Sequence, residues 1–377
     1  MDSNQGNAAG PHRRKILGLA AAGAAGLGAA CGPGPGAARG GTRATTQRVR
    51  WRLASSFPNS LDTIFGAAEV LSSCVSDMTD GNFEIHVYQA GELVPAMSVL
   101  DGVQTGACDV GQTGGYYYIG KDPALAFDTC VPFGLTARQQ AAWLEEAGGL
   151  ELMREVYADF GVINFPGGNT GAQMGGWFRR EINSAADLRG LRIRIPGLGG
   201  KVMDALGASV QSIPGGEIYT ALEMGTIDAT EWVGPYDDEK LGFHRVAKNY
   251  YYPGWWEPGP QLSFLVNKSA WEALPKSYQA IFEVACRRAG RAMQTRYDAK
   301  NPAALQRILE SGVTLRAFPE DVMTVARAAA EELLDEAALA DPRYARILEH
   351  WRAFRDASFR WFGTAELAYA EAVFRKT

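Results

Sequence analysis

Hydrophobic residues recur along the chain with two alternating periods. Phe83, Ile85 and Val87 occupy every second position, which is typical of a β-strand, whereas apolar residues of the segment 61–78 recur every third or fourth position, as in a helix. Further strands are predicted over 50–55, 106–111, 161–165, 172–178, 191–195, 227–232 and 263–267, and further helices over 93–105, 136–159, 200–206, 217–224, 275–311 and 342–375. This alternation predicts an α/β fold with mainly parallel sheets.

The strand predicted over 191–195 carries two positive charges. Its apolar residues alternate with Arg192 and Arg194, so both guanidinium groups lie on one face of the strand. A short helical turn capped by Ser184 precedes this strand, and a Gly/Asn turn at 166–171 separates two earlier strands.

Four polar residues from separate predicted segments suggest a cage for a small carboxylate: Asn169, Gln173, Arg194 and Glu231, with Trp232 beside the last. A guanidinium stays charged at any working pH and can hold a carboxylate through two parallel hydrogen bonds. Glu231 and Trp232 end a predicted strand, and ligands of open α/β sheets bind at the carboxyl ends of strands. The pattern therefore predicts an anion site centred on Arg194.

Length and charge narrow the class of protein. The 377 residues, 46% of them hydrophobic, suit two globular domains of ordinary size. The net charge of -5 argues against a nucleic-acid partner, because such proteins carry basic surfaces. No H-E-x-x-H, G-x-S-x-G or C-x-x-C motif is present, and we expect no enzyme activity.

The first 46 residues are predicted to be an export signal followed by a flexible tether. Arg13 and Arg14 precede an apolar run that ends near Ala30, which indicates either a twin-arginine signal or a Sec signal with an incidental arginine pair. Cys31 follows small residues, so it is either a lipid attachment site or, after ordinary cleavage nearby, lost or left unmodified. The remaining cysteines are expected to be small buried residues, with a disulfide left open: Cys74, Cys108, Cys130 and Cys286.

Two aromatic clusters and the C-terminal segment each allow two interpretations. The clusters at 116–118 and 250–258 either pack the core or contribute walls to a small dry pocket. The apolar face of the predicted helix 342–375 packs either on its own chain or on a second copy.

Four motifs together resemble the solute-binding subunits of tripartite ATP-independent periplasmic (TRAP) transporters. They are the stretches 168–178, 188–200, 214–238 and 250–259, within a resemblance that runs from about Arg50 to the C-terminus. The similarity is strongest to the DctP-type, α-keto-acid-binding, TakP-like branch of the family. It implies a type II periplasmic-binding-protein fold, in which two α/β lobes enclose a ligand and long C-terminal helices brace them.

The resemblance also implies how the chain is divided. Lobe I is expected over 47–166 and lobe II over 167–258. The segment 259–311 then returns to lobe I and forms a long bracing helix. A C-terminal strand and helices follow over 312–377 and are expected to form a homodimer.

Residue roles follow from the same resemblance. Arg194 is expected to hold the ligand carboxylate, while Gln173, Glu231 and a backbone oxygen of Trp232 hold a sodium or calcium ion that also touches the ligand. Further ligand contacts are expected from Asn169, Tyr117, Trp232 and Glu257. The alternative for Glu231 is a simple salt bridge to Arg194.

The sequence is therefore interpreted as an exported binding protein for a 2-oxo monocarboxylate such as pyruvate, which it delivers to TRAP membrane permease subunits. A 2-oxo acid presents two neighbouring oxygen atoms that a hard cation can chelate. The alternatives are a 2-hydroxy acid such as lactate bound with calcium, a periplasmic enzyme, or a ligand sensor. The expected location is the periplasm, either soluble or lipid-anchored through Cys31.

Overall fold

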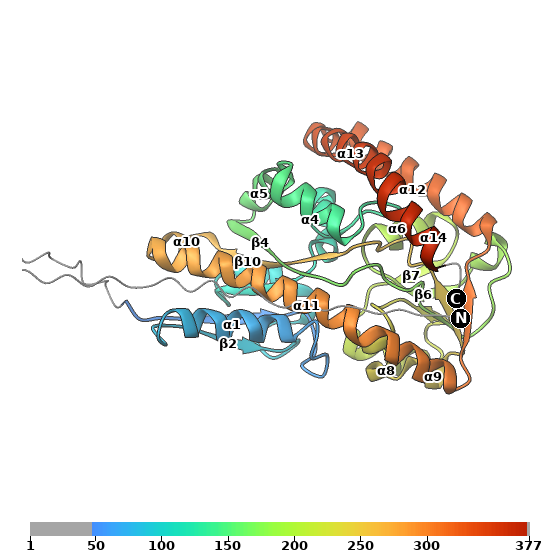
Figure 1. Ribbon diagram of the computed structural model, residues 1–377, viewed down its shortest axis with the longest axis horizontal. Coiled ribbons are helices and arrows are strands. Elements are labelled where there is room, and N and C mark those ends of the chain that lie inside the picture. Colours follow the sequence, from blue (N-terminus) through green and yellow to red (C-terminus); the bar gives the residue numbers. More distant parts are fainter. Residues whose placement is uncertain (1–46, 375–377) are drawn as a thin grey trace, which may run out of the picture. The chain divides into compact units, whose positions relative to one another are not determined.

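The structure is a computed structural model that describes residues 47–374. The predicted export signal and tether, including Arg13, Arg14 and Cys31, lie outside the described residues. Figure 1 shows the arrangement of helices and strands.

Two β-sheets organise the described chain, and we call the parts built on them lobe I and lobe II. The five-stranded sheet of lobe I has the order β2 (Phe83–Tyr88), β1 (Val49–Ser55), β3 (Val110–Thr113), β10 (Gln261–Asn267), β4 (Val162–Asn169). The six-stranded sheet of lobe II has the order β11 (Thr314–Ala317), β9 (Asn249–Tyr252), β5 (Trp177–Phe178), β8 (Ala229–Thr230), β6 (Arg192–Arg194), β7 (Ser209–Gln211).

Each sheet is parallel except for one reversed strand. In lobe I, β10 pairs antiparallel with both β3 and β4. In lobe II, β5 pairs antiparallel with both β8 and β9. The mainly parallel sheets predicted from the alternation of strands and helices are thus present. Both reversed strands begin just after the chain has crossed from one sheet to the other.

Helices cover both sheets. Those of lobe I are α1 (Gly66–Met78), α2 (Val99–Gln104), α3 (Ala126–Thr129), α4 (Ala137–Glu146), α5 (Gly149–Ala158) and α10 (Lys268–Glu272), with short 3-10 turns at Ala96–Ser98, Gly115–Tyr118 and Pro123–Leu125. Those of lobe II are α6 (Gly197–Ala205), α7 (Ile218–Glu223), α8 (Pro235–Leu241) and α9 (Phe243–Val246), with 3-10 turns at Ala185–Leu188 and Gly215–Glu217.

The helix α11 (Lys276–Glu310) runs along both lobes (Figure 1). Its 35 residues span about 52 Å at 1.5 Å per residue. It packs on α1 and β4 of lobe I and on α8 of lobe II. The long bracing helix is therefore present, with Pro302 inside it.

A second connection between the lobes is the hairpin of α12 (Glu320–Ala340) and α13 (Pro342–Phe362). The helix α12 packs on α6 of lobe II, and α13 packs on α4 of lobe I. Arg352 joins the two helices through ion pairs to Glu331 and Asp335. The chain then passes through a π-helical stretch (Gly363–Leu367) into α14 (Ala368–Phe374).

Several predicted boundaries were wrong for local reasons. The helix predicted over 136–159 is divided into α4 and α5 because Gly148 has a φ of 85°. The turn predicted over 166–171 starts later, because β4 continues to Asn169 along β10. The strand predicted over 172–178 shrinks to Trp177–Phe178. The C-terminal helices expected over 312–377 include α12, for which the sequence pattern set no bounds, and the helix predicted over 342–375 is interrupted at 363–367.

The cysteines behave as predicted among the described residues. Cys108, Cys130 and Cys286 are buried, Cys74 is partly buried, and all four are free thiols. Within residues 47–374, no helix combines the length and apolar character that crossing a membrane requires.

Candidate functional site

A small cavity lies where side chains of the two lobes meet. Counted as the space open to the centre of a water molecule, its volume is about 10 Å³, which is room for roughly one water. It is lined by Phe57, Ile64, Tyr116, Tyr117, Thr170, Gln173, Arg194, Glu231, Trp232, Val233, Pro260 and Leu262. Five of the seven predicted site residues are thus brought together: Tyr117, Gln173, Arg194, Glu231 and Trp232.

Arg194 ends strand β6 and is 1% exposed. Its Nε donates to the backbone oxygen of Ile213 at 3.1 Å, and its Nη1 forms an ion pair with Glu231. The guanidinium carbon lies 5.2 Å from the ring centre of Trp232, within the range of a cation–π contact. Its Nη2 is buried and has no hydrogen-bond partner among the described residues. A buried donor without a partner is costly and is ready to bind an acceptor.

Glu231 follows strand β8 and is also 1% exposed. Burial raises the pKa of Glu231 to about 7, because the loss of hydration outweighs the attraction of Arg194. Burial, the largest single influence, lowers the pKa of Arg194, but the combined attraction of Glu231, Tyr117, Tyr116 and Glu257 holds the pKa above its ordinary value. The positive charge of Arg194 alone thus does not offset the loss of hydration of the Glu231 carboxylate. A second cation nearby would favour the charged form of Glu231.

Two glycines allow the loop that carries Gln173 to approach the rest of the site. Gly176 has a φ of 80°, and a Cβ atom there would lie 2.2 Å from the backbone oxygen of Thr230. At Gly254, a Cβ atom would lie 2.6 Å from the backbone oxygen of Gln173. Only glycine fits such close backbone contacts. The Oε1 atom of Gln173 is buried without a hydrogen-bond partner among the described residues, while its Nε2 donates to Thr170 at 3.2 Å.

Asn169 and Glu257 lie beside the cavity and do not line it. Asn169 uses its side chain on backbone groups: Nδ2 donates to Gly259 at 3.0 Å, and Oδ1 accepts from Gly171 at 2.9 Å. Thr170, next to it, lines the cavity instead.

Glu257 is 3% exposed, and its backbone oxygen accepts from the backbone N–H of Gln173 at 3.2 Å. Burial, reinforced by repulsion from Glu231, raises the pKa of Glu257 well above its ordinary value. Its Oε2 has no hydrogen-bond partner among the described residues. The site therefore contains more buried acid than its one arginine can balance.

Tyr117 lies in the 3-10 turn after β3 and is partly buried. Its ring centre is 4.5 Å from that of Tyr116, and both rings line the cavity. For these two residues, the pocket-wall interpretation of the first aromatic cluster agrees with the structure.

The residues present suit a hard cation better than zinc. Among residues 47–374 there is no group of three or more His, Cys, Asp or Glu side chains that could hold a metal ion. The oxygen donors at the cavity are instead the Gln173 amide, the Glu231 carboxylate and backbone oxygens, which are the ligands that sodium and calcium prefer. The unpartnered Oε1 of Gln173 fits this donor set.

Sequence reasoning missed the apolar wall of the cavity, which includes Phe57, Ile64, Val233 and Leu262. Trp232 meets Phe57 edge to face, with ring centres 6.5 Å apart. In the sequence these residues look like ordinary core positions, so hydrophobic periodicity offers no signal that would single them out.

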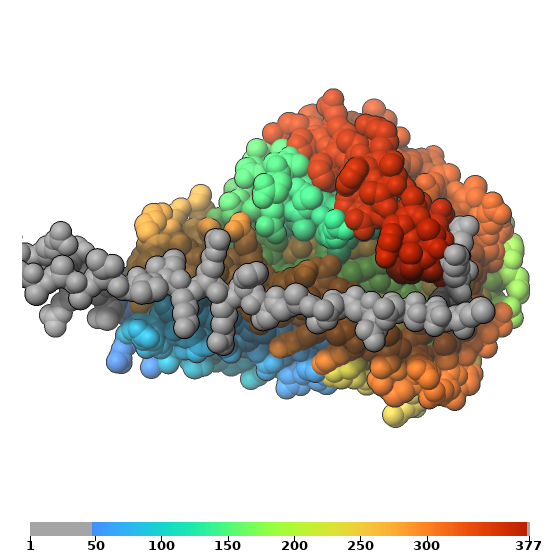
Figure 2. Space-filling view, viewed as in Figure 1, coloured from blue at the N-terminus to red at the C-terminus, as the bar shows by residue number. Residues whose placement is uncertain are grey.

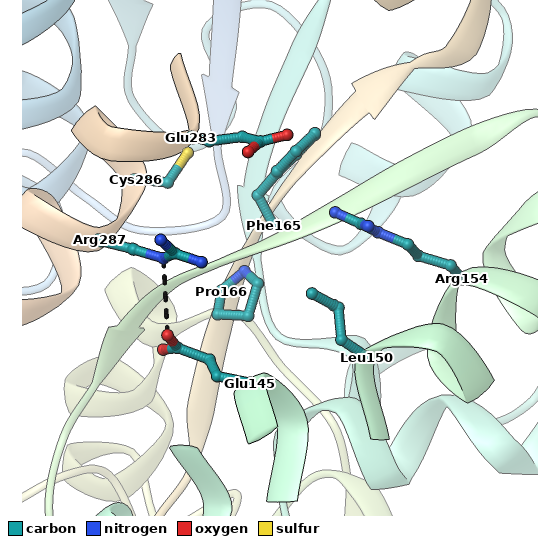
Figure 3. A pocket seen from close by; sticks show the side chains of 8 residues that line it. All are labelled: Glu145, Leu150, Arg154, Phe165, Pro166, Glu283, Cys286 and Arg287. Atoms are coloured by element: carbon teal, nitrogen blue, oxygen red, sulfur yellow. Dashed lines mark ion pairs between the residues drawn. The ribbon is translucent and has the colours of Figure 1, made fainter. Parts of the chain in front are cut away.

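A different hollow, shown in Figure 3, lies between α4, α5, β4 and α11 of lobe I. Its volume, counted in the same way, is about 40 Å³. An ion pair of 3.5 Å between Arg287 and Glu145 lies at this hollow. None of the predicted site residues lines this hollow, so it is not the candidate site, although its volume exceeds that of the cavity at Arg194.

Comparison with known proteins identifies the family. Residues 54–341 match the model of the bacterial extracellular solute-binding proteins, family 7. The chain is 54% identical over 321 residues to the monocarboxylate 2-oxoacid-binding periplasmic protein of Nostoc sp., which covers 85% of this chain and 88% of that protein.

Solved structures agree with this match. A TRAP transporter solute-binding protein from Bordetella bronchiseptica is 46% identical with a TM-score of 0.86, over 88% of this chain and 98% of that chain. It is a mixed-occupancy dimer with copurified calcium and picolinate in its active site. Another from Pseudoalteromonas atlantica, with bound sodium and pyruvate, is 43% identical with a TM-score of 0.83, over 86% of this chain and 99% of that chain. The chain therefore belongs to the bacterial extracellular solute-binding proteins of family 7, the DctP-type solute-binding proteins of TRAP transporters, which have a two-lobe periplasmic-binding-protein fold.

Proposed function

We propose that this protein captures a small 2-oxo monocarboxylate, such as pyruvate, and delivers it to the membrane permease of a TRAP transporter. The observation that carries the proposal is the pair of unpartnered buried atoms at the cavity, Nη2 of Arg194 and Oε1 of Gln173. One is a cationic donor and the other a neutral oxygen acceptor, so together they suit a carboxylate and a metal ion that bind side by side.

Arg194 holds the ligand carboxylate. The free-energy cost of burying the guanidinium falls when the anion binds to it. A sodium or calcium ion bound by Gln173, Glu231 and the backbone oxygen of Trp232 supplies a positive charge that neighbouring ligand oxygens can share. Tyr117 and Trp232 contact the ligand from the cavity wall, and Asn169 and Glu257 are further candidate contacts from beside it. The sodium or calcium and the carboxylate ligands of the two solved relatives support this assignment.

The present cavity is too small for pyruvate, because it has room for roughly one water. Arg194 and Glu231, which both line the cavity, form an ion pair with each other, as the salt-bridge alternative for Glu231 anticipates. Ligand and metal therefore enter when the lobes separate, and Glu231 exchanges part of its contact with Arg194 for the metal ion. Closure then buries the ligand between the lobes.

The apolar wall favours a monocarboxylate, since within residues 47–374 Arg194 is the only Lys, Arg or His side chain that lines the cavity. A 2-hydroxy acid such as lactate with calcium remains the second candidate, because its hydroxyl occupies the place of the ketone oxygen. Binding without chemical change is part of the proposal, and membership of a family of solute-binding proteins supports it. Among residues 47–374, no Ser, Cys or His lines the cavity.

The proposal includes the wider architecture. The chain first builds lobe I over 47–166 and then lobe II over 167–258, except that the last three residues of β4 extend beyond this boundary and β11 returns to the sheet of lobe II. The return and bracing helix are assigned to 259–311, and the C-terminal strand and helices to 312–377. These last helices are proposed to form a homodimer. The C-terminal helices, in red, lie on the face of the molecule seen in Figure 2. Apolar residues exposed on these helices support the assignment: Phe359, Trp361, Leu367, Tyr369 and Val373. The dimer of the Bordetella relative supports it further.

The family is extracytoplasmic. We propose export through a twin-arginine signal, with the mature protein either free in the periplasm or anchored at Cys31.

Calorimetric titration with pyruvate and with lactate tests the proposal. Protein stripped with a chelator is titrated in sodium, in calcium and in the absence of both. We expect tight binding of pyruvate only when one of the cations is present, and mass spectrometry should recover the ligand unchanged. An absence of pyruvate binding with either cation would contradict the proposed function, and conversion of the ligand would favour an enzyme.

A further inference from the structure

A cluster of charges joins the two lobes outside the cavity. Asp62 lies between β1 and α1 of lobe I, whereas Tyr236 and Lys240 lie on α8 of lobe II and Lys300 lies on α11. The Asp62 carboxylate accepts hydrogen bonds from all three of these side chains. A single acid of one lobe thus collects donors from two elements outside it.

Within the cluster, the acid and the tyrosine each contact both lysines. Tyr236 Oη and Lys300 Nζ each lie 3.1 Å from Oδ2 of Asp62, and Lys240 Nζ binds Oδ1. Both ammonium groups also lie over the Tyr236 ring, at 4.7 Å for Lys240 and 4.4 Å for Lys300. Lys240 adds a hydrogen bond of 3.2 Å to the backbone oxygen of Ser60. The cluster therefore fixes the loop that contains Asp62 at two points.

Both segments that meet in this cluster also line the cavity. Asp62 lies two residues before Ile64, and Tyr236 lies three residues after Val233; both Ile64 and Val233 face the cavity. The backbone oxygen of Ile64 accepts from Nε2 of Gln112 at 2.7 Å, which ties the loop to β3. A change in the distance between Asp62 and α8 is therefore passed, through a few residues of backbone, to the parts of the cavity wall that each lobe contributes.

We propose that Asp62 is a closure latch: a charged positioning residue that holds the two cavity walls together and thereby slows ligand release. The proposal rests on the proposed function, since it assumes that the cavity is the ligand site. Asp62 never touches the ligand and acts through Tyr236, Lys240 and Lys300.

The charge balance gives the latch its strength. Without the carboxylate, Lys240 and Lys300 would face the same tyrosine ring with no acid between them, and their mutual repulsion would favour separation. The three charged side chains are 30 to 48% exposed, so dissolved salt reaches and screens them. Retention of the ligand should therefore weaken as ionic strength rises, whereas the buried Arg194–Glu231 pair is largely shielded from salt.

The test compares Asp62→Asn with the wild-type protein. Stopped-flow fluorescence, with Trp232 as a reporter in the cavity, measures pyruvate release in sodium or calcium at low and at high salt. We expect Asp62→Asn to release pyruvate roughly three to thirty times faster at low salt, the range expected for a small network of exposed ion pairs. High salt should reduce the difference, and Asp62→Glu should restore slow release.

Glu84→Gln is the matched control. Glu84 pairs with Arg50 at 3.1 Å between β1 and β2 of one sheet, and its exposed fraction of 42% is close to the 48% of Asp62. This variant should release pyruvate at the wild-type rate. Equal release rates for Asp62→Asn and wild type at low salt would overturn the latch, as would an equal effect of Glu84→Gln.

Hydrogen exchange decides the proposal without any ligand. Segments 57–65 and 235–241 should both exchange faster in ligand-free Asp62→Asn than in wild type at low salt, because the latch holds both. Unchanged hydrogen exchange in these segments would overturn the latch, whether or not the protein binds pyruvate. A failure to bind pyruvate would contradict the proposed function and is measured separately.

Discussion

Two arginines of strand β6 lie two residues apart and have opposite surroundings. Arg192 is exposed and binds Asp228 through two hydrogen bonds, of 2.9 Å from Nε and 2.6 Å from Nη2. Arg194 is buried, meets its acid through Nη1 alone, and keeps Nη2 without a partner among the described residues. Arg192 and Asp228 hold each other through both nitrogens that face the acid. Arg194 keeps one buried N–H donor group that is available to a ligand.

The contrast shows how position along a strand determines the role of a side chain. The sequence places both arginines on one face, but the strand leaves the surface between them, so that only Arg194 reaches the cavity. An exposed pair contributes roughly 0 to 1 kcal/mol because water competes with it. A buried charge depends strongly on its partners.

The largest expected effect comes from removing Arg194. In Arg194→Ala, the ligand carboxylate would be buried without its cation, and loss of one partner of a buried charge pair costs about 3 to 5 kcal/mol. Pyruvate affinity should therefore fall by roughly a hundredfold to a few thousandfold in calorimetric titration. Arg192→Ala is the control on the same strand and should bind within about threefold of wild type. Similar losses in both variants would remove the distinction between the two arginines.

Asp238 extends the comparison to the acids, because Asp238 is buried whereas Asp228 is half-buried. Burial raises the pKa of Asp238 to about 7, although Trp177 and Tyr250 donate hydrogen bonds to it. The Arg192 hydrogen bonds instead lower the pKa of Asp228. Because the folded state holds the Asp238 proton more tightly, this group stabilises the fold at low pH, and that stability is lost as pH rises from about 4 to 7.

Asp238→Asn should remove this dependence. Urea unfolding should show a wild-type loss of up to about 4 kcal/mol from this group as pH rises through that window, and a flatter profile in the variant. Asp228→Asn is the control of opposite sign, since the stability that Asp228 provides is present at neutral pH and disappears as pH falls below about 4. Identical pH profiles for wild type and Asp238→Asn would show that Asp238 makes no pH-dependent contribution to the free energy of unfolding.

A smaller effect should follow from Glu231→Gln, which keeps an oxygen but removes the charge offered to a metal ion. We expect the sodium or calcium requirement for pyruvate binding to weaken and the affinity to fall by roughly ten- to a hundredfold, because cation and anion bind together. Titration of pyruvate against increasing calcium measures both. A variant with unchanged cation dependence would leave Glu231 as a salt-bridge partner only.

The sequence predicted much of the fold because its signals are local. The alternating periods located most strands and helices, including α11, and the motifs placed Arg194, Glu231 and Trp232 at one site. Boundaries failed where tertiary packing decides, as in the extension of β4 along β10. The division of helix 136–159 depends on the positive φ of Gly148, which the sequence did not reveal as a break.

The remaining parts of the site depend on contacts distant in sequence. Phe57 follows β1 and Leu262 lies in β10, and both line the cavity although they are about two hundred residues apart in the sequence. The sequence pointed to Asn169 as a polar site residue, yet its side chain forms hydrogen bonds with the backbone of Gly171 and Gly259. Its neighbour Thr170 lines the cavity instead. Whether Asn169 touches a ligand remains a prediction.

The interleaved order of the strands has a consequence for engineering. Lobe I takes β1 to β4 and then β10, while lobe II takes β5 to β9 and then β11, so neither lobe is one continuous stretch of the gene. Cutting the chain at any single point between β1 and β11 leaves a fragment with an incomplete sheet. The two halves therefore cannot be swapped between relatives as cassettes, and changes of ligand preference must be made by substitutions at the cavity wall.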